Sequence, residues 1–205
     1  MIFKSSNSLE KLPDEHLMRL VQEKNAKAFE ILYDRYSKLL FSYFLRMLRR
    51  DREKAEDFVQ DLFSKIIRKP ESFDSERKFK TWLYSVAHNM CKNEYAKHDV
   101  RKDAHKDIAY RHDATELQNT ATEIDRATFQ EALKAALIEL DSVKQTTFEL
   151  RFHQELSIQE ISEVMECSEG TVKSRIFYTL KFLNEKLKHF KHIVPYLIMI
   201  LTKLQ

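Results

Sequence analysis

The sequence has 205 residues, of which 43% are hydrophobic, and this is enough for one or two small packed domains. One glycine and three prolines leave few sites for tight hairpins or glycine-rich loops. A net charge of +3 is too small to identify a nucleic-acid partner by itself. The composition therefore predicts an all-α globular fold, and any electrostatic argument must rest on where the basic residues lie.

The cysteines and the apolar runs bear on the compartment. Cys91 and Cys167 lie far apart in different predicted helices, without a disulfide framework or a Cys-x-x-Cys spacing, so both are expected to be buried thiols. The first 16 residues lack the apolar core and cleavage site of a secretory signal. The longest apolar run, residues 193–201, contains Pro195 and is about half the length needed to span a bilayer. We therefore expect a cytoplasmic protein.

Four helices are predicted in the first half of the chain. Capping residues and apolar residues at three-to-four spacing predict helices over residues 14–21, 26–48, 53–68 and 81–96. Pro70 closes the third helix, and a polar connection leads to the fourth. The residues expected to face inward on the second and third helices are Phe29, Leu32, Tyr36, Leu39, Leu40, Phe44, Phe58, Leu62, Phe63, Ile66 and Ile67. Together these helices predict a first domain over residues 10–97.

Residues 98–122 are predicted to form a linker, because the segment mixes charges and has few large apolar residues to offset the entropy of ordering. His98, His105 and His112 recur every seven residues, which would align them on a helix and raises a metal-binding or proton-sensing interpretation. Imidazoles roughly 10 Å apart along a helix cannot share an ion. A solvated linker is the better interpretation, and no metal or cofactor is predicted.

The second domain, residues 123–187, is predicted to contain two supporting helices, 124–140 and 143–153, followed by a helix-turn-helix. Ser157 and Glu160 form a capping box at the start of the first helix of this motif, which should end near Met165. Ser168 caps the second helix. The inward residues of the two helices are Ile158, Ile161 and Val164, then Val172, Ile176, Leu180 and Leu183.

The outer face of the second helix of this motif points to DNA recognition. It carries Lys173, Ser174, Phe177, Tyr178 and Lys181, with Thr171 and Arg175 beside them. Hydroxyls, cations and aromatic edges would thus meet base edges and phosphates in a major groove. No carboxylate occurs between Gly170 and Leu183, whereas a plain solvated helix usually mixes acids with its bases. Any amphipathic helix pair could imitate the pattern, so this alternative stays open on these residues alone.

Three motifs follow one another along the chain: AEDFVQDLF, FKTWLYSVAHNMCKNEY and SEGTVKSRIF. In this order they resemble the extracytoplasmic-function class of bacterial sigma-70-family sigma factors, and the resemblance covers residues 14–187. It implies that residues 10–97 are sigma region 2, residues 98–122 the linker, and residues 123–187 sigma region 4. The implied function is to give core RNA polymerase its promoter specificity and to start strand opening, without enzymatic activity, cofactor or small-molecule substrate.

The resemblance assigns the segment 55–67 to binding of the β′ clamp helices of core polymerase, which also contacts the factor through its β subunit. Here Asp57, Gln60 and Asp61 occupy positions i, i+3 and i+4, and so form one polar patch. Taken alone, such a trio is more commonly an ordinary solvated helix face. Only its place within the larger pattern favours a docking surface.

The segment 73–95 is where the family melts the minus-ten promoter element and captures an unpaired base. Capture requires a shaped pocket, hydrogen bonds to the base, a stacking surface and cations for the phosphates. The resemblance assigns this role to Phe73, Lys80, Trp82, Asn89, Lys92 and Asn93. We expect Asn89 to read the base and Phe73 to shape the pocket beneath it. A tryptophan at the start of an amphipathic helix, such as Trp82, is more often a core residue.

The resemblance assigns recognition of the minus-thirty-five element to Thr171, Lys173, Ser174, Arg175, Phe177 and Tyr178, with Arg175 nearer the DNA backbone than the bases. The chain departs from many relatives at Glu166, where they have a glycine. A left-handed backbone there would cost about 1 kcal/mol. It departs from some at Tyr178, where they have a basic residue, so the promoter preference cannot be carried over.

Two other classes of protein remain open on the sequence alone. A helix-turn-helix repressor or activator would normally dimerise to read two half-sites, and the separate N-terminal domain argues against it. A nucleic-acid enzyme would need a metal-ligand cluster, phosphate loop or nucleophile motif, and none is present.

The implied partners are core polymerase, promoter DNA as duplex and melted strand, and an anti-sigma factor. The anti-sigma factor could hold the protein at the membrane, whereas within holoenzyme the protein would lie on the nucleoid. Nothing in the sequence shows that an anti-sigma factor exists. The extension 188–205 lies beyond the resemblance. Its expected roles, in order, are packing on the second domain, docking a regulatory protein, and touching lipid.

Overall fold

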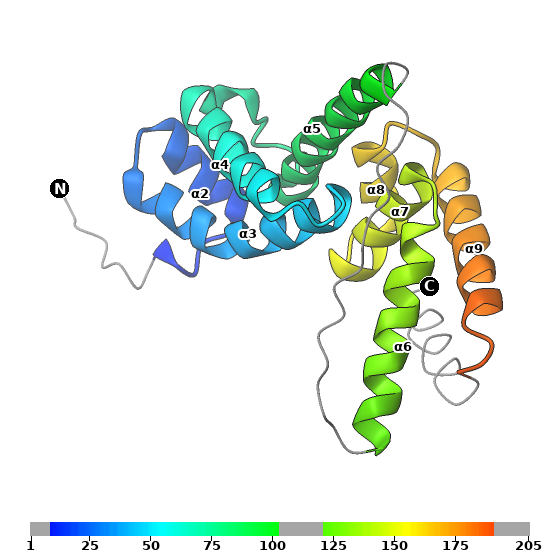
Figure 1. Ribbon diagram of the computed structural model, residues 1–205. Coiled ribbons are helices and arrows are strands. Elements are labelled where there is room, and N and C mark those ends of the chain that lie inside the picture. The colour runs from blue at the N-terminus through cyan, green and yellow to red at the C-terminus, as the bar shows by residue number, and fades with distance from the viewer. Residues whose placement is uncertain (1–8, 103–120, 191–205) are drawn as a thin grey trace.

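The computed structural model describes residues 9–102 and 121–190, and side chains within 9–97 and 128–190. Regular structure in these ranges is helical throughout, which confirms the all-α prediction. Figure 1 shows two groups of helices, α2 to α5 and α6 to α9, with α5 of the first group beside α8 of the second. None of the described helices is both long and apolar enough to cross a membrane.

The first group corresponds to the predicted first domain. Asn25 caps α3 by accepting a hydrogen bond from the Ala28 amide (3.1 Å), and Asp51 caps α4 in the same way through the Lys54 amide (3.0 Å). Between these helices the chain turns through two left-handed residues, Arg49 and Arg50. The elements are α2 (Asp14–Gln22), α3 (Ala26–Met47), α4 (Arg52–Arg68), the 3-10 turn η1 (Pro70–Ser72) and α5 (Phe79–Lys102).

The second group contains the predicted helix-turn-helix as α8 and α9. The capping box of Ser157 and Glu160 is formed, and Ser168 caps α9. Glu166, in the turn, has φ of 51°, so the left-handed backbone expected at this position is confirmed. The elements are α6 (Ala121–Ile138), α7 (Ser142–Phe148), the π-helical turn η2 (Glu149–His153), α8 (Ile158–Val164) and α9 (Glu169–Lys186).

Some details differ from the predictions. Helix α5 runs to Lys102, into the expected linker, because no glycine or proline stops it after Pro70. Leu39 and Ile67 were predicted to face inward but are 44% and 57% exposed. Each is the neighbour of a buried residue, and adjacent helix positions point about 100° apart. The side chains of the three aligned histidines, and residues 191–205, lie outside the described parts.

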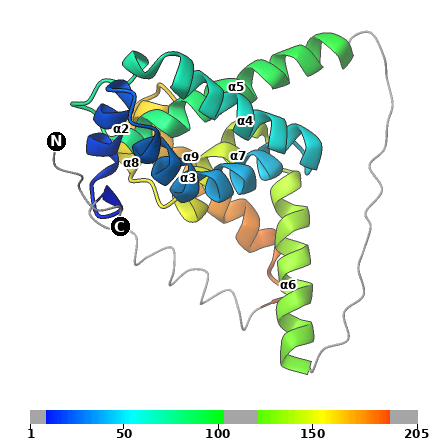
Figure 2. The same cartoon turned by 90° about the vertical axis from the view of Figure 1, so that its left-hand side faces the viewer.

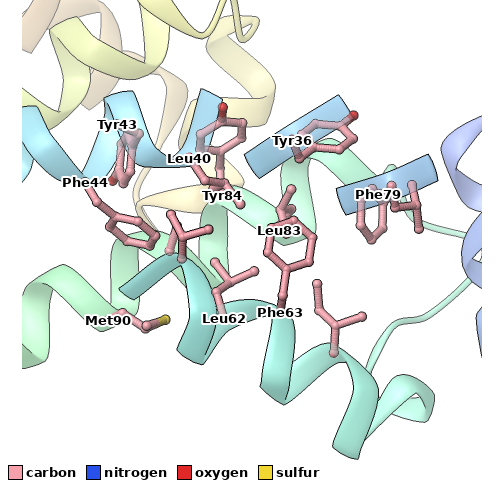
Figure 3. Close-up of a cluster of buried hydrophobic side chains, with 14 of the residues drawn as sticks. Tyr36, Leu40, Tyr43, Phe44, Leu62, Phe63, Phe79, Leu83, Tyr84 and Met90 are labelled. Atoms are coloured by element: carbon pink, nitrogen blue, oxygen red, sulfur yellow. The ribbon is translucent and has the colours of Figure 1, made fainter. Parts of the chain in front are cut away.

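One apolar core joins the two groups. Figure 3 shows its centre, where Tyr43 and Phe44 of α3 pack against Tyr84 of α5 and against residues of α4. The second group adds its own residues to this cluster: Leu150, Leu156, Ile161, Val164 and Val172. A smaller cluster around Phe129, Phe148 and Leu183 holds α6, α7 and α9 together. The two domains are therefore docked on each other in this structure (Figure 2).

Candidate DNA and polymerase interfaces

Helix α9 presents an exposed aromatic pair on its outer side. Phe177 and Tyr178 are 61% and 57% exposed, and their ring centroids lie 5.4 Å apart with the planes at 78°. Lys173 and Ser174 are also exposed, one turn earlier. On the opposite side Val172 is fully buried and anchors the helix. The face predicted to read bases is thus solvent-accessible, and it is presented by a helix whose inner side is fixed.

Three of the predicted α9 residues have polar partners within the domain, one of them Lys173, whose Nζ lies 3.8 Å from Glu169 Oε2. The Thr171 hydroxyl lies 2.9 Å from Ser168 Oγ, so it belongs to the helix cap. The Arg175 guanidinium donates to Cys167 Sγ at 3.4 Å, and so lies against the turn of the helix-turn-helix. Cys167 is half-buried rather than buried as expected, whereas Cys91 is buried. A phosphate contact by Arg175 stays a prediction.

The predicted minus-ten residues at the start of α5 form an aromatic cluster. Phe73 is 2% exposed, and its ring centroid lies 5.2 Å from that of Trp82 and 5.5 Å from that of Phe79. Trp82 itself is half-buried, between the core and solvent. The segment is fixed from α2, where the Gln22 amide donates to the carbonyls of Pro70 and Phe73, each at 3.0 Å. Phe73 therefore supports Trp82 from beneath and is itself shielded from solvent.

Further along α5, Asn89, Lys92 and Asn93 are exposed, while Lys80 is half-buried. The three exposed residues are spaced i, i+3 and i+4, so they share one side of the helix. Trp82 lies seven residues before Asn89, which places it on the same side, roughly 10 Å away along the axis. The structure thus brings these predicted residues onto one track.

His88, which the sequence analysis did not single out, is half-buried on α5, and its Nδ1 atom is buried without a hydrogen-bond partner. Burial, followed by the Lys92 cation, lowers the pKa of His88 below its ordinary value; Glu166 raises it and Arg175 lowers it. No pattern in the sequence distinguishes this histidine, because the charges that act on it come partly from the other domain.

The predicted polymerase-binding residues are all exposed on α4. Asp57, Gln60 and Asp61 lie on the solvent side, and Val59, on the other side, is buried. Ile67 is seven residues after Gln60, so it extends the same face by two turns, and it is 57% exposed. An apolar residue thus adjoins the acidic patch, and its exposure follows from the helix geometry.

The contact between the domains contains a buried polar network that sequence analysis did not find. Figure 1 shows η2, just after α7, facing the first group, and there the Glu149 carboxylate is 3% exposed. It accepts hydrogen bonds from Arg46 Nε at 2.8 Å and Gln154 Nε2 at 3.0 Å, and lies 2.9 Å from His153 Nδ1. Tyr84 of α5 donates its hydroxyl hydrogen to Gln154. Burial alone would raise the pKa of Glu149, but the hydrogen bonds from His153 and Arg46 outweigh it and hold the pKa low.

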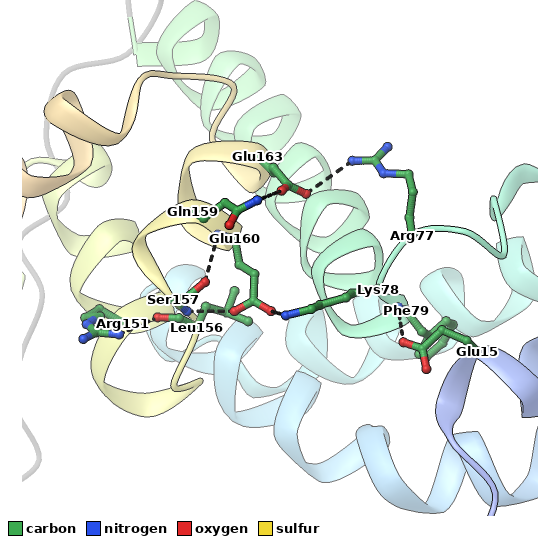
Figure 4. Close-up of polar contacts among 10 residues, drawn as sticks. All are labelled: Glu15, Arg77, Lys78, Phe79, Arg151, Leu156, Ser157, Gln159, Glu160 and Glu163. Atoms are coloured by element: carbon green, nitrogen blue, oxygen red, sulfur yellow. Dashed lines mark hydrogen bonds and ion pairs between the residues drawn. The ribbon is translucent and has the colours of Figure 1, made fainter. Parts of the chain in front are cut away.

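At the outer edge of this contact, two ion pairs cross from one domain to the other. Figure 4 shows Lys78 reaching Glu160 and Arg77 reaching Glu163. Lys78 Nζ lies 2.9 Å from Glu160 Oε1, and Arg77 Nη2 lies 3.8 Å from Glu163 Oε2. These residues line a polar depression of about 480 Å³ together with Glu76, Thr81 and Gln159. Among the described residues, no group of three or more histidines, cysteines and acids could hold a metal ion.

Comparison with known proteins agrees with the two-domain arrangement. The family described as Sigma-70 region 2 matches residues 32–101, and Sigma-70, region 4, matches residues 130–183. The ECF RNA polymerase sigma-E factor of Haemophilus influenzae is 31% identical over 192 residues, covering 87% of this chain and 97% of that protein. The sigma-E factor of Escherichia coli K12 is 31% identical over 193 residues, covering 87% and 96% of the two chains.

Two solved structures share the fold. The sigma factor RpoE in complex with the anti-sigma factor NepR from Bartonella quintana has a TM-score of 0.63 at 22% identity, covering 79% of this chain and 98% of that one. CnrH in complex with the cytosolic domain of CnrY has a TM-score of 0.62 at 20% identity, covering 86% and 97%.

Two matched regions, in this order and over most of the chain, show that the protein belongs to the sigma-70 family of RNA polymerase sigma factors. Its relatives at 31% identity are sigma factors of the extracytoplasmic-function class, and the chain is a member of that class. It is thus a transcription initiation factor rather than an enzyme.

Proposed function

We propose that this sigma factor docks on core RNA polymerase through α4, reads the minus-thirty-five element with α9, and holds the melted minus-ten strand on α5. The observation that supports this division best is the accessibility of the three faces. Asp57 and Asp61 on α4, Asn89 on α5 and Phe177 on α9 are all exposed while the opposite sides of their helices are buried. Three polar faces on well-packed helices suit three separate macromolecular contacts.

For duplex reading, the pair Phe177 and Tyr178 offers aromatic edges for apolar contact with thymine methyl groups, and Tyr178 adds a hydroxyl. Lys173 and Ser174 add a cation and a second hydroxyl. Helix α9 is capped at Ser168 and packed on its inner side, so it is already ordered before these side chains enter a groove. We infer that their identities set the promoter sequence.

For strand opening, Asn89 can donate to and accept from the edge of an unpaired base, and Lys92 can neutralise a neighbouring phosphate. Trp82, supported from below by Phe73, offers a face for stacking. Strand opening is then driven by differential binding. The protein shifts the opening equilibrium by the difference between its binding free energies for melted and for duplex promoter, and by no more. The RNA-synthesis chemistry belongs to the polymerase.

We further propose that the protein acts in the cytoplasm, and on the nucleoid when bound to polymerase, under the control of an anti-sigma factor. One structural neighbour, the sigma factor RpoE of Bartonella quintana, is in complex with the anti-sigma factor NepR, which supports such a partner here.

Run-off transcription with bacterial core polymerase on a pooled promoter library tests these assignments. We expect Asp57→Arg/Asp61→Arg to lose transcripts because it fails to bind core. We expect Asn89→Ala to bind core but to lose or retarget transcripts at the minus-ten element. The matched control is Glu139→Arg/Glu185→Arg, which makes the same charge change at exposed positions of the other domain. Normal core binding by the first variant would contradict the α4 assignment.

A further inference from the structure

The two ion pairs between the domains involve cations that lie beside the proposed melted-strand site. Arg77 and Lys78 immediately precede α5, and Lys78 lies four residues before Trp82. Both side chains are well exposed, at 50% and 73%, so nothing in their own domain covers them. Their partners, Glu160 and Glu163, belong to the first helix of the helix-turn-helix. Carboxylates of one DNA-binding domain thus take the positions that phosphates would take on the other.

Glu160 is held in place for this contact. Its carboxylate accepts a hydrogen bond from the Ser157 amide at 2.8 Å as part of the capping box, and its side chain is only 16% exposed. The Lys78 ammonium meets the other carboxylate oxygen, at 2.9 Å. Since the cap already fixes the carboxylate, forming the ion pair costs less side-chain entropy than a pair between two mobile side chains.

The docked arrangement is incompatible with promoter binding by both domains. Elements centred near minus ten and minus thirty-five are about 25 base pairs apart, which is about 85 Å of duplex at 3.4 Å per step. In this structure α5 and α8 are in direct contact, so the two readers cannot reach both elements at once. Asn89 and Lys92 on α5, and Phe177 and Tyr178 on α9, remain exposed in the docked chain, so docking restricts where the two readers lie and does not cover these side chains.

We propose that Arg77 and Lys78 bind phosphates of the melted promoter strand, and that in the docked chain Glu160 and Glu163 occupy these cations in place of DNA. The proposal rests on the proposed function, since it adds two residues to the strand-binding track of α5. Strand binding and domain docking then compete for the same two side chains. Separation of the domains on polymerase releases both cations next to Trp82.

Binding of the free full-length protein to a fluorescein-labelled 20-nucleotide poly(dT), followed by anisotropy at several salt concentrations, tests the competition. Glu160→Gln/Glu163→Gln removes the two charges while glutamine preserves the capping box. An exposed ion pair shifts an equilibrium by at most about five-fold, so affinity should rise by roughly three- to twenty-fold. The control Glu139→Gln/Glu185→Gln has the same change in net charge and should change affinity much less.

The strand-binding role of the cations has its own readout. Arg77→Gln/Lys78→Gln should weaken binding and reduce the slope of log affinity against log salt by about 1.4, because each cation that neutralises a phosphate of a single strand contributes about 0.7 to that slope. An unchanged slope would overturn this part of the proposal.

A charge swap separates docking from strand binding. The distance between the domains is followed by energy transfer between dyes on Lys38→Cys and Lys181→Cys, in a chain with Cys167→Ser, so that only the buried Cys91 remains. Arg77→Glu alone should shift the docking equilibrium toward separated domains, which lowers energy transfer, and it should weaken poly(dT) binding. Adding Glu163→Arg should restore the docked distance but not the affinity, because residue 77 still repels phosphate.

If the double variant regains both the docked distance and the poly(dT) affinity, Arg77 acts only in docking. If the distance does not change in the single variant, Arg77 acts only on DNA. Either result overturns the proposal. Core-dependent transcription by the same variants keeps the proposed function separate. If the intact chain yields transcripts but the glutamate variants change neither the distance between the domains nor the affinity for poly(dT), the proposed function holds and the proposed competition between docking and strand binding is wrong.

Discussion

Glu149 is a buried carboxylate at the contact between the domains. A carboxylate that is 3% exposed is stable only when its lone pairs are satisfied, and Arg46, Gln154 and His153 surround it. Arg46 comes from α3 of the other domain, 103 residues away in sequence. The same hydrogen bonds therefore satisfy the buried charge and hold the domains in register.

Arg46→Ala should destabilise the protein by about 2 kcal/mol, because it leaves a buried carboxylate short of its main cation. The figure is below that for a fully buried pair, since the Arg46 side chain is 37% exposed. Urea unfolding at pH 7.5, followed by circular dichroism, measures the change. Lys27→Ala, which breaks the exposed pair with Glu30, is the control and should cost less than about 0.5 kcal/mol. Equal effects of the two variants would refute the argument.

His88 should make stability depend on pH. Its pKa is lowered in the folded chain, so the unfolded chain binds the proton first, and stability is lost as pH falls below the ordinary histidine value of about 6.5. Glu149 contributes little to this change, because its lowered pKa lies below 4.5. Stability measured between pH 7.5 and 5.5 should depend less on pH in His88→Gln than in the parent. An equal pH dependence in His88→Gln and the parent would contradict this prediction.

At the scale of elements, the stability of α9 depends on its N-terminal cap at Ser168 and on its narrow buried side. Ser168→Ala removes the hydroxyl that accepts from the Thr171 amide at 3.1 Å and contacts the Thr171 hydroxyl. We expect a loss of about 1 kcal/mol. Thermal unfolding measures it, with Ser174→Ala as the control on the same helix, where the cap stays intact. A stability for Ser168→Ala equal to that of the control would show that the cap contributes nothing.

Stability and DNA reading should be separable on α9. Phe177→Ala/Tyr178→Ala changes two exposed side chains, so the free energy of unfolding should shift by less than about 0.5 kcal/mol for each. Val172→Ala, at a fully buried position, should cost about 2 kcal/mol. In footprints with holoenzyme, protection of the minus-thirty-five element should disappear with the first variant. Protection that persists would remove the two aromatic residues from the proposed interface.

At the scale of the whole molecule, the shared core predicts that the domains stay together without their covalent connection. A protease site inserted between residues 110 and 111 allows the chain to be cut after folding. We expect the two fragments to migrate together in size-exclusion chromatography at low salt, because Leu156 and Ile161 are buried in the core of the first domain. Arg46→Glu, which faces Glu149 with a like charge, should separate them. Separation of the unmodified fragments would contradict the docked arrangement.

Much of the fold follows from local sequence. The helices of both domains begin at caps such as Asp51, Ser157 and Ser168, and their buried sides follow the three-to-four spacing. These signals act within a few residues, which is why most helix starts and the exposed faces of α4, α5 and α9 were predictable, whereas the end of α5 at Lys102 was not. The errors at Leu39 and Ile67 arose where two adjacent apolar residues compete for one buried position.

The sequence by itself determined the two helical domains and the outer faces of α4, α5 and α9 that we assign to polymerase and DNA, whereas the left-handed turn at Glu166 was expected only from the resemblance to the family. Only the tertiary structure decided that the domains are docked and that Glu149 meets Arg46. It likewise showed that Lys78 and Arg77 face carboxylates of the helix-turn-helix. The physical reason is how far along the chain each kind of interaction reaches. Periodicity and capping record neighbours along a helix, whereas contacts between residues 82 to 103 positions apart depend on two surfaces fitting together, which no local pattern encodes.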